Sequence, residues 1–171
     1  MPSLAPAFSD EGALGTSLLE VAVPADVAPR RAAEVLGPGR QAWLGELVSA
    51  AAGPDGPSRH LLDLELRVSD RAPRVAFRKA AYVDVGPLLG RGDRASFALD
   101  ISWRAAGLTP LFPVFAGTLR WMDGELRLEG RYAPPGGGVG AVADRLLLNI
   151  AARGTGRRLL QRIAEVMGAQ A

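Results

Sequence analysis

The chain of 171 residues contains no cysteine, one histidine, His60, and one lysine, Lys79. The lack of cysteine excludes disulfide bonds and thiol nucleophiles, and it is compatible with a reducing compartment. With His60 as the only imidazole, a zinc site built from histidine and cysteine is excluded as well. We therefore expect a cytoplasmic protein without a metal site.

An excess of charge of one sign is also missing, since 20 basic residues face 18 acidic ones and leave a net charge of +2. Nucleic-acid binding calls for basic residues gathered on one face. The last helix carries several arginines, which the helical spacing directs to scattered sides of that helix: Arg145, Arg153, Arg157, Arg158 and Arg162. We therefore expect no nucleic-acid partner.

No apolar run approaches the roughly 18 residues that a membrane span requires. The first 15 residues have neither a basic start nor a hydrophobic signal core. Rich in Ala, Pro, Ser and Gly, they are typical of a flexible leader. We expect residues 1–15 to form this leader and residues 16–168 to form a single domain. A domain of this length can bury a stable core without disulfide bonds or metal ions.

What the sequence does contain is clear periodicity. Alternating apolar residues predict a first strand over Thr16–Val23, and two short helices are expected to follow over Val27–Leu36 and Arg40–Ala51. After the Gly and Pro cluster at 53–57 the period changes to two residues, as in Arg59–Val68, which is typical of half-buried antiparallel strands.

The same alternation predicts strands over Val75–Val85 and along the row from Phe97 to Trp103. Asp123-Gly124 then predicts a two-residue hairpin turn, which places Trp121 opposite Leu126. The sixth strand of this series ends near Tyr132. A long apolar-periodic helix follows to the end of the chain, so we expect an α+β fold in which an antiparallel sheet curves over that helix.

A Gly-rich segment at the start of this helix, Gly138-Val139-Gly140-Ala141-Val142-Ala143, fits a dinucleotide-binding pattern. That pattern requires a second parallel strand after the helix, and the chain has none there. We therefore expect no cofactor.

The element order, together with the segments 111–113, 130–136 and 144–148, resembles the START-like, polyketide cyclase and lipid-transfer superfamily, in particular its actinobacterial members. The resemblance covers about residues 16–168 and implies the helix-grip fold. It also implies an apolar pocket between the sheet and the last helix. The superfamily has seven strands where six are counted here, so a seventh is expected from a split of Val75–Val85, at a bulge near Ala80-Ala81, or near Phe112–Ala116.

From this fold we predict a non-catalytic carrier or sensor, monomeric or homodimeric, whose partner is a small apolar or amphipathic molecule. Strand parity and helix angle select the residues expected to line its cavity. They are Phe77, Lys79, Phe97, Leu99, Ile101, Trp103, Phe112, Phe115, Trp121, Tyr132, Leu146, Ile150 and Arg153.

Two alternatives stay open. The first is a cyclase, dehydratase or hydrolase acting on a polyketide-like substrate, with Lys79, His60, Tyr132 or Arg153 as acid, base or oxyanion partner. It requires at least two of these groups to converge inside the cavity. The second is a protein-interaction module that uses the outer face of the same fold. Lys79 shares the inward parity of Phe77, unless a bulge turns it outward.

Overall fold

The computed structural model describes residues 16–38, 42–50, 56–67, 76–91, 96–107, 114–133 and 142–169. The leader expected over residues 1–15 lies outside this part of the chain. The elements run in the order β1 (Ser17–Pro24), α1 (Pro29–Leu36), β2 (Glu46–Ala50), β3 (Ser58–Arg67), β4 (Ala76–Val85), β5 (Leu89–Arg91), β6 (Ser96–Ala105), β7 (Val114–Met122), β8 (Glu125–Ala133) and α2 (Val142–Gly168).

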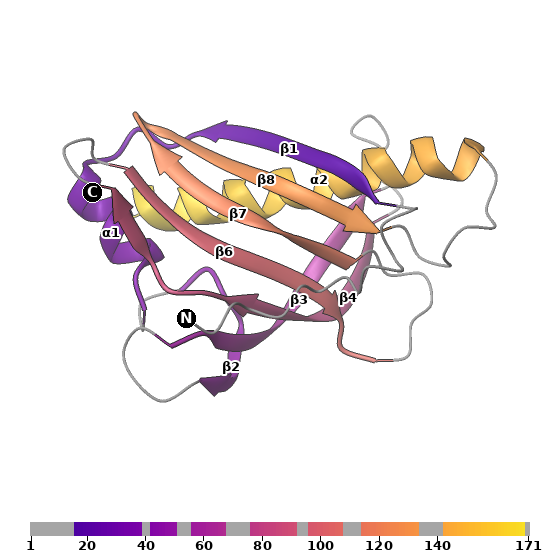
Figure 1. Ribbon diagram of the computed structural model, residues 1–171, viewed down its shortest axis with the longest axis horizontal. Coiled ribbons are helices and arrows are strands. Elements are labelled where there is room, and N and C mark those ends of the chain that lie inside the picture. The colour runs from indigo at the N-terminus through magenta and orange to yellow at the C-terminus, as the bar shows by residue number, and fades with distance from the viewer. Residues whose placement is uncertain are drawn as a thin grey trace.

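The strands form one sheet of eight in the order β1-β8-β7-β6-β4-β3-β2, with β5 paired to β6. Every pair is antiparallel. Figure 1 shows the sheet curving over α2, which runs along its concave side. The predicted α+β architecture is confirmed.

The hairpin between β7 and β8 has the predicted register. Trp121 pairs with Leu126 and Leu119 with Leu128, so apolar residues meet on one face. Asp123 and Gly124 have φ angles of 51° and 79°, which is the left-handed geometry that a primed two-residue turn requires. A short turn fixes every partner along both strands, and this is why the sequence alone was sufficient here.

The prediction of a second short helix over Arg40–Ala51 is wrong. Residues 42–45 form a turn, and Glu46–Ala50 form β2, which pairs with β3 at the open edge of the sheet. Leu47 and Val48 are exposed, and the register shifts between Leu47 and Ser49. The helix-like spacing of the apolar residues is a local pattern. The segment forms a strand because the edge of β3 offers backbone hydrogen bonds, which local spacing does not reveal.

The sheet of the described residues has more strands than the six or seven expected, because β2 and the three-residue β5 were not anticipated. The proposed split of the Val75–Val85 segment is wrong. β4 pairs with β3 from Ala76 to Val85 without a shift in register, so no bulge occurs at Ala80-Ala81.

The concave face of the sheet, α1 and the second half of α2 enclose one apolar core. The largest fully buried side chains in it are Trp43, Phe115, Leu19, Leu36, Leu99, Ile101, Leu119, Leu126, Leu128, Leu160, Ile163 and Met167. Two indole groups within it are satisfied, because Trp43 donates to the Val35 carbonyl and Trp121 to the Ala25 carbonyl, each at 3.1 Å.

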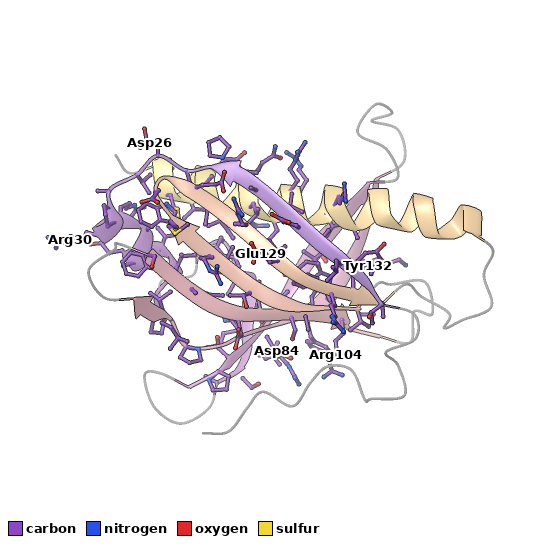
Figure 2. All side chains as sticks on the ribbon, turned by 45° about the horizontal axis from the view of Figure 1, so that its top comes forward. Asp26, Arg30, Asp84, Arg104, Glu129 and Tyr132 are labelled. Atoms are coloured by element: carbon purple, nitrogen blue, oxygen red, sulfur yellow. The ribbon has the colours of Figure 1, made fainter. Side chains whose placement is uncertain are left out.

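The convex face carries polar pairs. Arg59 Nε donates to Asp84 Oδ1 at 2.6 Å, and Arg59 Nη2 to Asp84 Oδ2 at 2.9 Å, so the pair is bidentate across β3 and β4. This hydrogen-bonded partner raises the pKa of Arg59. The guanidinium groups of Arg59 and Arg104 also lie 5.8 and 5.7 Å from the centre of the Tyr82 ring. Figure 2 shows Asp84 and Arg104 close together on this face.

Candidate functional site

On the concave face of the sheet, helix α2 packs against β3 toward one edge and against β1 and β8 toward the other edge. Gly156 marks its close approach to β1 and β8, since an added Cβ there would lie 3.2 Å from Leu128 and 3.3 Å from Val21. The chain continues as one helix through Gly154-Thr155-Gly156. The curved sheet therefore contacts α2 near both of its edges. A groove lies along each flank of the helix.

The groove between β3 and α2 has a volume of about 510 Å³. Its apolar base consists of Leu62 and Leu64 from β3 and Leu159 from α2, each 4% exposed. The buried Thr155 lies beside this base. Alternation along β3 and the helical spacing of residues 155 and 159 bring these side chains to one place.

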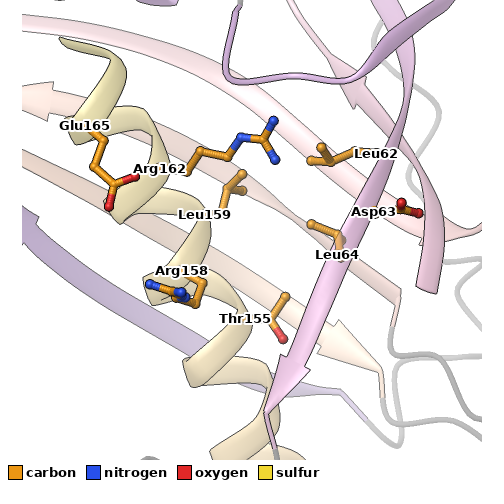
Figure 3. A pocket seen from close by; sticks show the side chains of 8 residues that line it. All are labelled: Leu62, Asp63, Leu64, Thr155, Arg158, Leu159, Arg162 and Glu165. Carbon is orange, nitrogen blue, oxygen red and sulfur yellow. The ribbon is translucent and has the colours of Figure 1, made fainter. Parts of the chain in front are cut away.

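Charged residues form the rim of this groove: Asp63, Arg158, Arg162 and Glu165. Figure 3 shows the Arg162 side chain extending from α2 across the groove toward Leu62. Asp63 points away from α2 on the far side of β3, and the Glu165 carboxylate points away from the groove. Arg158 Nη1 donates to Gln161 Oε1 at 3.4 Å on the exposed side of the helix.

A second groove, of about 640 Å³, lies on the other flank of α2 against the end of β1. It is lined by Ala22, Val23, Pro24, Arg157, Arg158, Gln161, Ala164 and Glu165. Of these residues only Val23 is buried, so the apolar base is smaller than that beside β3. The groove along β3 is therefore the better site for an apolar ligand.

The structure buries most of the described residues that the sequence assigned to the cavity. Leu99, Ile101, Trp103, Phe115, Trp121 and Tyr132 are each at most 2% exposed, and Phe97 is partly buried. Phe112 lies outside the described residues, as do the side chains of Phe77, Leu146 and Ile150. That this set lines a ligand cavity remains a prediction. Its buried side chains pack in the core, and none of its described members lines the groove beside β3.

The charged members of that set, Lys79 and Arg153, are both exposed. The bulge that would turn Lys79 outward is absent, because Lys79 pairs directly with Leu64 and keeps the parity of the concave face. Arg153 lies on the half of α2 that faces away from the core.

One register row crosses the concave face from β3 to β8: His60, Val83, Trp103, Phe115 and Tyr132. Trp103 stacks on Phe115 with ring centres 4.1 Å apart, and its indole N–H has no hydrogen-bond partner among the described residues. His60 and Tyr132 are four strand spacings of about 4.8 Å apart along this row, far beyond hydrogen-bonding distance. The structure thus does not bring His60 and Tyr132 together, and Lys79 and Arg153 are exposed.

His60 is 8% exposed, and its Nε2 lies 3.0 Å from Ser58 Oγ. Burial lowers the pKa of His60, and the backbone of Gly45 opposes this shift in part. The imidazole is therefore neutral near pH 7. It sits next to Leu62 on the same face of β3, at one end of the groove base.

Sequence reasoning missed the groove as a site. Leu62 and Leu64 alternate along the predicted strand and Leu159 lies on the apolar side of the predicted helix, but the sequence does not give the angle at which α2 passes β3. Arg153, Arg157, Arg158 and Arg162 are all exposed. At 100° per residue they span about 180°, so they point to different flanks of the helix.

A curved sheet of antiparallel strands that packs around one carboxy-terminal helix is the helix-grip fold. No protein-family model and no curated protein matches the chain by sequence. Within the described residues, no helix combines the length and the apolar character of a membrane span.

Solved structures resemble the chain over most of its length. The Mll3558 protein from Rhizobium loti matches with a TM-score of 0.50 at 10% identity, covering 90% of this chain and 96% of that one. Ara h 8.0201 gives 0.45 at 14% identity over 91% and 100% of the two chains. A STAR-related lipid transfer protein from Xanthomonas axonopodis gives 0.41 at 15% over 85% of each. At such identities the likeness shows the fold alone.

Proposed function

We propose that residues 16–168 form one domain that reversibly binds a small, largely apolar molecule between the sheet and α2, as a carrier or sensor without catalysis. The observation that carries this proposal is the groove of about 510 Å³ with three buried leucines at its base. Grooves of this size accommodate drug-sized ligands. The separation of His60 and Tyr132 by four strand spacings, together with the exposure of Lys79 and Arg153, supports binding over catalysis.

The apolar base sets the scale of affinity. Covering about 300 Å² of apolar ligand surface contributes roughly 7 kcal/mol at 25 cal/mol per Å². The loss of translational and rotational freedom offsets part of that gain. Since a dissociation constant of 1 μM requires about 8 kcal/mol, we expect dissociation constants between about 100 μM and the millimolar range for an uncharged apolar probe.

Nile red, an uncharged dye, tests this proposal by fluorescence titration. We expect saturable binding to the wild type and at least tenfold weaker binding to Leu64→Trp, because the larger ring fills the groove. Leu89→Trp adds the same ring at a position that is 61% exposed on β5 and should leave binding unchanged. Equal binding by all three proteins would contradict the proposal.

A further inference from the structure

The exposed half of α2 is strongly cationic. Between residues 152 and 169 the helix carries Arg153, Arg157, Arg158 and Arg162, and the only acidic residue in that range is Glu165. These four guanidinium groups are spread over the exposed half of α2, with Arg162 at the groove beside β3 and Arg157 at the groove beside β1. An unbalanced charge of this kind attracts anions.

Several arginines elsewhere on the described surface have acidic partners. Arg59 pairs with Asp84, Arg127 with Glu125 at 2.8 Å, and both Arg30 and Arg31 with Glu34. In the part of the chain that the structure describes, no carboxylate lies within 4.0 Å of an α2 guanidinium, and the same holds for the exposed Arg104, Arg120 and Arg131. What distinguishes Arg162 among these arginines is its position at the groove beside β3.

Arg162 is the arginine best placed for such an anion. Its side chain crosses the groove above the leucine base, and the two acidic rim residues point elsewhere (Figure 3). Arg158 lies one helical turn before Arg162, but its guanidinium points away from that of Arg162 and hydrogen-bonds Gln161. Arginine is suited to binding an anion, because its planar fork binds carboxylate or phosphate oxygens in pairs.

We infer that the groove takes an anionic amphiphile, with an apolar chain over Leu62, Leu64 and Leu159 and a carboxylate or phosphate headgroup held by Arg162. This inference rests on the proposed function and specifies its ligand. The leucines supply the apolar contact, and Arg162 selects charge and fixes which end of the ligand lies at the rim. The exposed position of Arg162 leaves the headgroup in contact with water.

Displacement of Nile red by matched ligands below their micelle concentrations tests the inference. We expect dodecanoate and dodecyl phosphate to displace the dye at concentrations at least tenfold lower than dodecanol, because a charge-assisted hydrogen bond adds to the shared apolar contact. Arg162→Met keeps most of the side-chain stem and should abolish this difference, whereas Arg162→Lys should retain part of it. Arg153→Met on the same helix lies outside the groove and should leave it unchanged.

The outcomes separate the two proposals. If dodecanoate and dodecanol displace the dye equally, the groove binds apolar ligands and the anionic inference is overturned. If neither displaces a bound dye, the proposed function fails with it. Inorganic phosphate alone should not displace the dye at millimolar concentration. Displacement by phosphate, or binding confined to phosphatidylglycerol vesicles, would overturn the inference in favour of a free-anion site or a membrane surface.

Discussion

At the scale of single residues, His60 links stability to pH. Burial lowers its pKa below the ordinary value near 6.5, so the unfolded chain takes up a proton before the folded protein does as the pH falls. We therefore expect the free energy of unfolding to decrease as the pH drops from about 7 through 6.5 toward the folded-state pKa. Below that pKa both states are protonated, and the contribution of His60 stays constant.

Urea unfolding of the wild type and of His60→Gln between pH 5 and 8 measures this contribution as the difference between the two proteins. The difference should be flat above about pH 7.5 and should change below pH 7. Because His60 is the only histidine, one imidazole signal in a proton NMR titration reports its folded-state pKa directly. A folded-state pKa at or above 6.5 would contradict the prediction.

At the scale of the elements, two glycines let β7 and β8 approach each other under the Phe115 ring. Gly117 pairs directly with Gly130. A Cβ added at Gly117 would overlap the Glu129 carbonyl oxygen and would lie 2.7 Å from both Gly130 Cα and Phe115 Cζ. The backbone atoms there cannot move without changing the curvature of the sheet at its centre.

We therefore expect Gly117→Ala to lower the free energy of unfolding by about 2 kcal/mol or more, the range of overpacked core sites. Gly107→Ala is the matched control, because no atom lies within 4 Å of its added Cβ. It should change stability by less than about 0.5 kcal/mol. Chemical denaturation of both variants measures the contrast, and equal stabilities would show that the sheet adjusts without strain.

The elements differ in how far the sequence predicts them, and the reason is physical. The register of the β7–β8 hairpin follows from two turn residues, and the burial of Leu99, Ile101 and Trp103 follows from alternation. β2 depends on the free edge of β3, which its own residues do not encode. Alternation of apolar residues also indicates which side chains point inward. Whether these side chains fill the interior depends on how closely α2 approaches the sheet.

The same limit applies to the candidate site. The groove exists because α2 passes β3 at an angle that leaves a space beside Leu62 and Leu64. The sequence places Arg162 on the polar side of a helix. Only the packed structure shows that its side chain extends over a leucine base.

At the scale of the whole molecule, α2 is the element that closes the fold, and its carboxy-terminal end is tied to α1. Arg31 Nε donates to the Met167 carbonyl at 3.2 Å, and Arg31 Nη2 donates to the Val166 carbonyl at 3.0 Å. The last carbonyls of a helix have no partners within the helix, and a cation at this end also favours the helix dipole. Arg31 therefore fixes the last turn of α2 against the rest of the core.

Replacing Arg31 with Ala should lower the free energy of unfolding by about 1–2 kcal/mol, because two charge-assisted hydrogen bonds are lost and two carbonyls lose their partners. Arg30→Ala is a neighbouring control. The Arg30 side chain is 91% exposed against 24% for Arg31, and it points away from the body of the protein in Figure 2. Its ion pair with Glu34 should contribute less than about 0.5 kcal/mol.

Urea unfolding measures the total loss of stability in Arg31→Ala, and hydrogen exchange shows which residues are affected. In Arg31→Ala the amides of residues 163–168 should exchange faster than in the wild type, while those of β7 and β8 should change only by the loss in global stability. If Arg31→Ala and Arg30→Ala had the same cost, or if exchange in the last turn of α2 were unaltered, the tie between the two helices would contribute nothing to closing the fold. The grip would then depend on the apolar contacts of Leu160, Ile163 and Met167 alone.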